Sequence, residues 1–555
     1  MPNPYPPIKR ELQTAKTEDA NPAIQLFGRR FFGDQTVPEF LIEFLLVATS
    51  QKKIAEEIIP ADGSLFPDME LLSNWPAETP LKYAPKSRLN LKLFALLGAS
   101  KLETRHQTHR DHYRDLIKSI EQNIEAFGGI PPEEVLKTLE NLFLGFQRVG
   151  GQRTWCAQSF LPIRPEMIAG ETIWNSTKGK AAQSWDDLTD NFNHFFTSNQ
   201  HRFLARGGEA LYLQICNALR TPTENIDAWC GNIKASHTER ERCPEALRTA
   251  LAQGLHKALN ACPATVGALA RFIDEGAEPE TARRTDNENG LPRYTKCGWC
   301  PEDTWSESLL FAVDLLRLCD AALDPVDRLG LMETACTMQV LRTLCAQSAR
   351  YDESNDGAGA GALGYIWAVS DPGGNNNILK RISRRSVEAN LLMIQRAIRH
   401  PEILANIQKQ HHPAKPREKH FADSYKEADT RYGHKLFLTL AKRLGFMVPR
   451  RGKGARFVLT NHLLRYLVLT TVRPGERMTR DSFMEQVFQR YGMALGRKYL
   501  CCACEWCGAH PPSTLGNDSD KWLVDMLSAA GMLIRLSDSC SMVENPLSDG
   551  REISR

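Results

Sequence analysis

The chain has 555 residues, of which 42% are hydrophobic and 24% are charged, and its formal net charge is +3. This composition is that of a folded globular protein and excludes a chain that is mainly disordered. Because a single hydrophobic core stops growing well below this length, we expect about two to four domains.

The start of the chain and its apolar stretches argue against a membrane protein. The N-terminal sequence MPNPYPPIKRELQ holds four prolines and has no apolar segment of the kind that a secretory signal needs. The longest apolar stretches, such as FLIEFLLVA and HLLRYLVLTTV, are short and carry charges, which is typical of buried helices. We therefore expect a cytoplasmic protein that does not contact a membrane.

The fifteen cysteines indicate a reducing compartment. Several of them stand singly within helical patterns, where a thiol acts as a small core residue; these are Cys216, Cys319, Cys336 and Cys345.

Residues 1–150 are expected to form an N-terminal helical domain. Pro38 stands at the start of a predicted helix, EFLIEFLLVATSQKKIAEEI, and Pro131 and Pro132 precede another, EEVLKTLENLFLGFQRV. Proline suits the first positions of a helix because the missing N–H has no partner there in any case.

Residues 151–351 are expected to form a middle helical domain. The segments EALYLQICNALR and CPEALRTALAQGLHKAL repeat apolar residues at intervals of three and four. Two longer helices follow, SESLLFAVDLLRLCDAAL and RLGLMETACTMQVLRTLCAQSAR, and Pro325 separates them.

Residues 352–377 are rich in Gly, Asn and Asp, and their composition predicts a linker that contains one short strand around Tyr365 to Val369. Residues 378–555 then form the C-terminal region. Its segment HKLFLTLAKRLG predicts a helix that ends at Gly445. FMVP and ARFVL predict two strands joined by the basic turn RRGKG, in which glycine permits positive φ.

The end of the chain has the element order of a winged helix. Two helices, TNHLLRYLVLTTV and TRDSFMEQVFQRYG, are followed by a third, SDKWLVDMLSAAG, and by a hairpin in MLIRLSDSCSMVEN. Thr479 is the expected N-cap of the second helix. We therefore predict a mainly α, multi-domain helical protein with a C-terminal winged-helix-like α+β region. A helical bundle with an appended β-hairpin would show the same order.

Basic residues concentrate in residues 372–475, where 21 Lys and Arg stand against 6 Asp and Glu, a net charge of +15. The other residues together carry −12. Cations that neutralise phosphates release condensed counterions, which is the main source of sequence-independent affinity for nucleic acid. We therefore predict binding of nucleic acid, in the first place DNA, through Arg443, Arg450, Arg451, Lys453, Arg456 and Arg465. The alternative is that this basic surface docks on the acidic remainder of the chain or on an acidic protein partner.

Two groups of cysteines have the spacing of structural zinc ligands. A local site would use Cys501, Cys504, Cys507 and His510. A long-range site would join Cys297 and Cys300 to Cys504 and Cys507. Four protein ligands would leave no open position, so such a zinc would be structural. The alternatives are core thiols on a buried helix and, less favoured, a redox-active pair.

Several strings carry a resemblance to a known group of proteins: Phe27–Phe31 (FGRRF) with Asp34–Thr36, Arg153–Pro162, and the segment GFMVPRRGKGARFVLT. Together they resemble uncharacterised accessory proteins that are encoded beside large helicases in bacterial anti-phage defence islands, of the Druantia type or similar. The resemblance implies a role in phage defence with other defence-system proteins as partners, and it assigns no catalytic residue.

These observations predict a nucleic-acid-binding, non-catalytic subunit of a bacterial anti-phage defence complex. One alternative is a nuclease or other hydrolase whose active site is assembled from distant parts of the chain. Another is a scaffold whose basic surface binds acidic protein partners.

Overall fold

The computed structural model describes residues 2–7, 21–84, 207–261, 294–409 and 417–546, with short gaps inside these ranges, and only isolated short segments between 85 and 206. The described residues are mainly helical and carry several small sheets, which confirms the mainly α prediction. The predicted helix at EEVLKTLENLFLGFQRV lies almost entirely outside the described residues.

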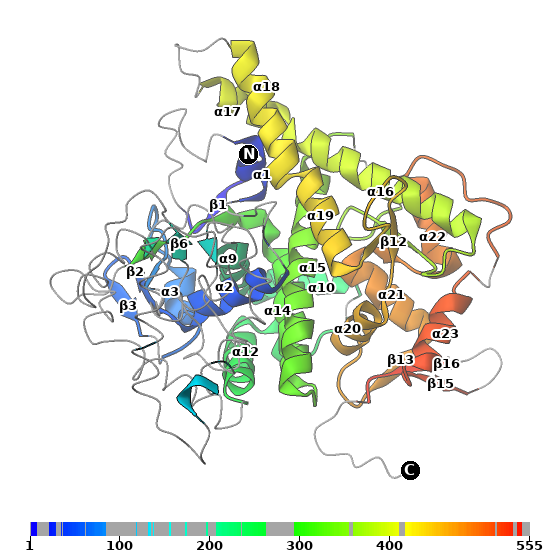
Figure 1. Ribbon diagram of the computed structural model, residues 1–555, viewed down its shortest axis with the longest axis horizontal. Coiled ribbons are helices and arrows are strands. Elements are labelled where there is room, and N and C mark those ends of the chain that lie inside the picture. The colour runs from blue at the N-terminus through cyan, green and yellow to red at the C-terminus, as the bar shows by residue number, and fades with distance from the viewer. Residues whose placement is uncertain are drawn as a thin grey trace.

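Two long helices occupy the centre of the molecule. Helix α14 (Trp305–Asp320) and helix α15 (Pro325–Tyr351) are buried along most of their length and pack against each other. Asp324 caps α15 and Pro325 stands in its first turn, as predicted from the proline. The helices around α14 include α9 (Gly207–Leu219), α10 (Thr223–Asn232), α11 (Glu239–Arg242) and α12 (Pro244–Leu259). In Figure 1, α14 and α15 stand between the blue N-terminal elements on the left and the orange and red elements of the end of the chain on the right.

The N-terminal part is less helical than predicted. Helix α2 (Val37–Thr49) starts at Pro38 as expected but ends nine residues early, because β2 (Gln51–Ile54) and β3 (Glu57–Ile59) form a hairpin where the helix was predicted to continue. At this point the buried Lys52 ammonium donates to the carbonyl oxygens of Ala48, in the last turn of α2, and of Ser50, just after it, at 2.7 and 2.9 Å.

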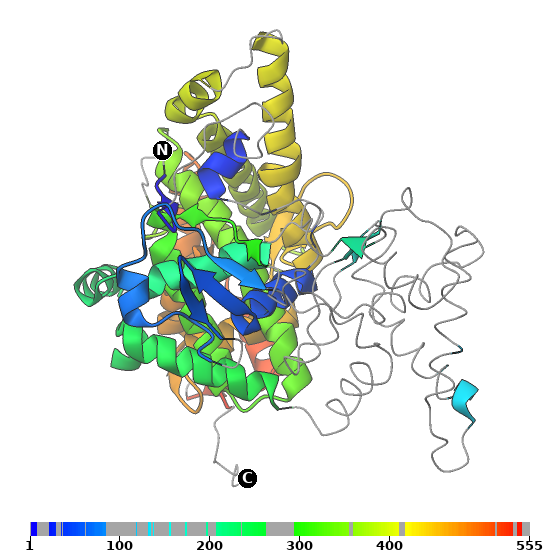
Figure 2. The same ribbon diagram turned by 90° about the vertical axis from the view of Figure 1, so that its left-hand side faces the viewer.

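The hairpin belongs to a four-stranded sheet with the order β3-β2-β4-β8, which joins β4 (Lys82–Ala84) to β8 (Thr295–Lys296). In the same way, β1 (Pro4–Tyr5) pairs with β9 (Cys300–Pro301). The remaining elements here are α1 (Pro22–Phe27) and α3 (Met69–Ser73). Strands of the predicted N-terminal and middle domains thus share sheets. Figure 2 shows this side of the molecule, with the blue N-terminal elements in front of the green helices.

Helix α16 (Asn377–Ile398) follows the predicted linker and is not among the predicted elements. It is followed by α17 (Pro401–Lys409), α18 (Arg417–Glu427), the π-helical segment η8 (Ala428–Tyr432) and α19 (His434–Leu444). Helices α17 and α18, yellow in both overall views, project from the body. Helix α19 ends at Gly445, which has φ of 79°, as the sequence predicted.

The predicted basic hairpin forms but does not stand alone. Strands β11 (Met447–Val448) and β12 (Arg456–Val458) pair antiparallel. Strand β12 also pairs in parallel with β10 (Trp367–Ser370), the strand predicted in the linker, and β10 pairs in parallel with β14 (Met493–Ala494). The four strands form one sheet of order β11-β12-β10-β14, so the hairpin is its edge.

The last part of the chain contains α20 (Asn461–Thr471), β13 (Arg477–Thr479), α21 (Arg480–Tyr491), α22 (Gly496–Trp506), α23 (Lys521–Ala529), β15 (Leu533–Arg535) and β16 (Ser541–Glu544). The Thr479 side chain accepts from the Ser482 backbone N–H, which confirms the predicted N-cap. Strands β13, β16 and β15 form a second small sheet in that order.

One hydrophobic core runs through the described residues. Helices α14 and α15 contact α19 and α20 directly, across the predicted linker. The cysteines predicted as core positions are free thiols and buried: Cys216, Cys319, Cys336 and Cys345.

Candidate nucleic-acid interface

The turn between β11 and β12 presents three exposed cations, Arg450, Arg451 and Lys453. Gly452 and Gly454 have φ of 96° and 79°, a conformation that L-residues rarely adopt, so the turn depends on these glycines. Among the described residues, none of the three cations has an ion-pair partner. Their side chains are therefore available to an anion.

Helix α16 lies beside this turn, and one face of the helix is basic and exposed. Its inner face binds the sheet through polar groups: Ser386 Oγ accepts from the Ala368 N–H at 3.0 Å and donates to the Ile366 carbonyl at 2.9 Å. Ser383 Oγ accepts from the Phe457 N–H at 2.8 Å. This anchoring leaves the opposite face to Lys380, Arg381, Arg384 and Arg385, of which the three arginines are exposed and Lys380 half-exposed.

The two groups of cations form one surface. A Cβ added to Gly454 in the turn would lie 3.5 Å from the Arg384 guanidinium on α16. A Cβ on Gly374, in the loop that precedes α16, would lie 2.9 Å from Lys380 Cε. We call this surface, formed by Lys380, Arg381, Arg384, Arg385, Arg450, Arg451 and Lys453, the basic surface.

The other predicted contact residues each have a partner within the chain, and Arg456 has the most. Arg456 donates to Ser370 Oγ and to the carbonyl oxygens of Asp371 and Pro372, so it holds the loop between β10 and α16. Arg443 donates to the Gln35 carbonyl oxygen, and Arg465 pairs with Asp327 at 3.1 Å.

The four residues on α16 were missed by the sequence-based site prediction. Their spacing, two adjacent pairs four residues apart, places them on one side of a helix and was the available signal.

The predicted zinc ligands near the C-terminus lie on or next to α22, beside α16. Burial, followed by the neighbouring Cys501, raises the pKa of the Cys504 thiol. Burial and Cys504 raise the pKa of Cys507 to about 12, while Arg385 of α16 acts in the opposite direction. The thiols are thus close enough to interact. His510 is exposed in the loop that follows.

The other cysteine pair lies beside α9. Cys300, on β9, is fully buried, and burial followed by Cys216 raises its pKa well above the ordinary value. Cys297 is also buried. In the part of the chain that the structure describes, no group of three or more His, Cys, Asp and Glu side chains is arranged to hold a metal ion. Both zinc arrangements remain predictions.

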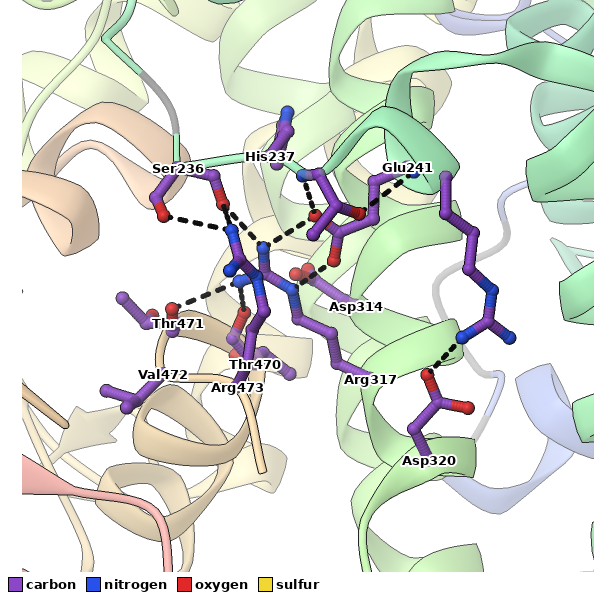
Figure 3. A network of polar contacts seen from close by, with 12 residues as sticks. Ser236, His237, Glu241, Asp314, Arg317, Asp320, Thr470, Thr471, Val472 and Arg473 are labelled. Atoms are coloured by element: carbon purple, nitrogen blue, oxygen red, sulfur yellow. Dashed lines mark hydrogen bonds and ion pairs between the residues drawn. The ribbon is translucent and has the colours of Figure 1, made fainter. Parts of the chain in front are cut away.

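A buried ionic network links α11 and α14 to the end of α20, as Figure 3 shows. The Arg317 guanidinium pairs with both carboxylate oxygens of Glu241 at 2.6 and 3.0 Å. It also donates to the carbonyl oxygens of Thr470 and Thr471 at 2.8 and 3.0 Å, the last carbonyls of α20. Burial raises the pKa of Glu241, but the hydrogen bonds and charge of Arg317 outweigh burial and hold it at about 2. Arg317 therefore caps α20 with a charge that is fully neutralised.

A second part of the network centres on Asp314. This buried carboxylate on α14 pairs with Arg342 of α15 at 2.9 Å, with Arg490 of α21, and with the Tyr466 hydroxyl of α20 at 3.1 Å. Burial lowers the pKa of both arginines, but the surrounding groups, Asp314 first among them, together outweigh burial, so the net shift of each pKa is upward.

His237 is held neutral at the edge of this network. Arg490 Nη1 lies 2.7 Å from His237 Nε2 and can only donate, so Nε2 is the acceptor and Nδ1, 3.2 Å from Cys230 Sγ, carries the proton. Burial, followed by the charges of Arg490 and Arg317, lowers the pKa of His237 well below 6.5. The groups of this network thus bind one another.

Comparisons with protein families, with curated proteins and with solved structures found nothing that matches this chain. Among the described helices, none combines the length and apolar character that a membrane crossing requires.

Proposed function

We propose that this protein is a nucleic-acid-binding, non-catalytic subunit of a bacterial anti-phage defence complex. The observation that carries the binding proposal is the basic surface, in which the turn cations Arg450, Arg451 and Lys453 lie beside four cations of α16. The role in defence, the defence-system partners and the cytoplasmic location rest on the resemblance and composition of the sequence.

The basic surface suits the phosphate backbone. Its turn cations have no ion-pair partner among the described residues, so binding a phosphate would break no internal pair. The positive end of the α16 dipole adds to the same potential. If each of the seven cations neutralises one phosphate of duplex DNA, the logarithm of the binding constant should fall with the logarithm of salt concentration with a slope of about −6.

A winged-helix arrangement of the last part of the chain is also part of the proposal. The order α20, β13, α21, α23, β15, β16, interrupted after α21 by β14 and α22, and a sheet of order β13-β16-β15 support it. The third helix of this arrangement, α23, exposes Lys521 and Asp525 and so has no excess of basic charge. We therefore assign the phosphate contacts to the basic surface and not to α23.

Three buried carboxylates, Asp314, Glu241 and Glu307, are each paired with arginine inside the described part of the fold and serve its packing. The non-catalytic part of the proposal rests on the sequence resemblance, which assigns no catalytic residue.

The test is a salt titration of binding to a duplex DNA, with three triple variants of the full-length protein. Replacing Arg450, Arg451 and Lys453 by Ala, or Arg381, Arg384 and Arg385 by Ala, should each reduce the steepness of the salt dependence by about 3 and weaken binding for every sequence alike. The control replaces Arg240, Arg242 and Arg248 of α11 and α12, of which Arg240 is exposed and the other two are half-exposed, and it should leave the slope near that of the native protein.

Two results would overturn the proposal. One is native protein that binds neither DNA nor RNA at low salt. The other is binding that the control variant weakens as much as the two surface variants do. If the native protein does not bind nucleic acid but binds an acidic polypeptide through the basic surface, the scaffold alternative replaces the nucleic-acid proposal.

A further inference from the structure

A cavity of about 670 Å³ lies away from the basic surface, where the ends of several elements meet. Its walls come from the end of α9, the start of α10, the 3-10 turn η7 (Glu302–Thr304), the start of α14 and the end of α15. Cavities of about 300 to 1,000 Å³ are typical of small-molecule sites. We propose that this cavity binds a small organic cation that carries an ammonium or guanidinium group. The proposal is independent of nucleic-acid binding.

The first argument is the carboxylate of Asp303, which lines the cavity and lacks one hydrogen-bond donor. Its Oδ2 accepts from the Tyr351 hydroxyl at 3.2 Å and from Gln347 Nε2 at 3.4 Å. Its Oδ1 is buried and has no hydrogen-bond partner. The neighbouring Arg350 does not supply the missing donor, because its guanidinium binds Glu307. Because no arginine or lysine forms an ion pair with Asp303 among the described residues, its carboxylate keeps a negative charge at the cavity wall that an ammonium or guanidinium group of a ligand would offset.

The second argument is the charge of the cavity wall. The charged residues that line the cavity are Arg220, Glu302 and Asp303, so the wall carries one net negative charge. Arg220 is already neutralised, because it pairs with Glu302, and its guanidinium lies 4.6 Å from the centre of the Tyr5 ring. Asp303 is therefore the charge that a ligand would meet.

Aromatic residues provide the third argument. Trp305 and Tyr351 both line the cavity and are partly exposed. Trp305 is fixed by an edge-on contact with Trp229, whose ring centre lies 5.8 Å away. Aromatic faces attract cations, so a cavity wall that holds a carboxylate and two aromatic residues favours an organic cation.

One feature of the wall favours an anion. The start of α10 also lines the cavity, through Pro222 and Asn225, and a helix N-terminus carries about half a positive charge. The full charge of Asp303 outweighs it, because an anion would lie near an uncompensated carboxylate.

The experiment is isothermal titration of the full-length protein with agmatine and with putrescine. 1,4-Butanediol, which has the length of putrescine without its charges, is the ligand control. We expect saturable binding of at least one diamine and none of the diol. Asp303→Asn should weaken binding by about tenfold or more, since a charged hydrogen bond is lost. Asp525→Asn, which removes an exposed carboxylate on α23, should bind like the native protein.

Trp305→Leu is the second variant and should also weaken diamine binding, so the test does not depend on whether Asp303→Asn folds. The proposal is overturned if the native protein binds neither diamine, if it binds the diol equally well, or if both Asp303→Asn and Trp305→Leu bind the diamine as tightly as the native protein does. DNA binding measured on the same samples should be unchanged, which separates this site from the basic surface.

Discussion

Replacing Asp314 by Asn should destabilise the protein more than any surface change. Asp314 is 0% exposed and is the only carboxylate paired with Arg342 and Arg490 among the described residues. Both arginines are themselves almost fully buried. Since an arginine cannot lose its proton inside a protein, the substitution leaves two buried positive charges facing a neutral amide.

The magnitude follows from the cost of breaking a buried ion pair, about 3 to 5 kcal/mol. The Asn side chain keeps one acceptor oxygen for Arg342, Arg490 or the Tyr466 hydroxyl. The loss of stability should therefore stay below twice the cost of one broken pair, although two ion pairs are broken. We expect a decrease of about 3 to 5 kcal/mol in the free energy of unfolding. Asp314 joins α14 to α15, α20 and α21, so these four helices should lose stability together.

The assay is urea denaturation followed by far-ultraviolet circular dichroism, with the midpoint and the slope measured for each variant. Asp327→Asn is the control, because Asp327 forms an exposed pair with Arg465 that should contribute less than about 1 kcal/mol. An Asp314→Asn variant within about 1 kcal/mol of the native protein would refute the reasoning. It would mean that water or another group already screens the two arginines.

Three further predictions concern pH, packing and metal. The pKa of His237 is lower in the folded than in the unfolded protein, so stability should fall as the pH drops below 6.5; His237→Gln should flatten this dependence in denaturation midpoints measured between pH 6.5 and 5. Gly208→Ala should cost about 2 kcal/mol or more, seen as a lower melting temperature, because its Cβ would lie 2.3 Å from the Phe44 nitrogen; an unchanged melting temperature would contradict the packing. Elemental analysis should find zinc that Cys504→Ser removes if the predicted site exists, and a metal-free, folded sample would rule it out.

Local sequence signals predicted many of the helices correctly. Apolar spacing located α9, α12, α14 and α15, and the caps at Thr479 and Gly445 formed as expected. These features depend on residues within a few positions of one another, so a short stretch of sequence contains the information.

Pairings between distant residues could not be predicted in this way. The strand predicted in the linker became the centre of a sheet because β12 and β14, far along the chain, pair with it. The hairpin that follows α2 pairs in its sheet with β4, and its Lys52 binds carbonyl oxygens at the end of α2, which no helical periodicity reveals. The cavity at Asp303 is likewise lined by residues from separate parts of the chain.

The sequence by itself determined where basic charge concentrates and which segments are helical. Only the tertiary structure decided which cations have partners, because Arg443, Arg456 and Arg465 bind carbonyl oxygens or a carboxylate, whereas Arg450, Arg451 and Lys453 are exposed and form no ion pair among the described residues. It also brought α16 beside the turn. Net charge is a sum over residues, but the availability of each charge depends on the partners that folding places next to it.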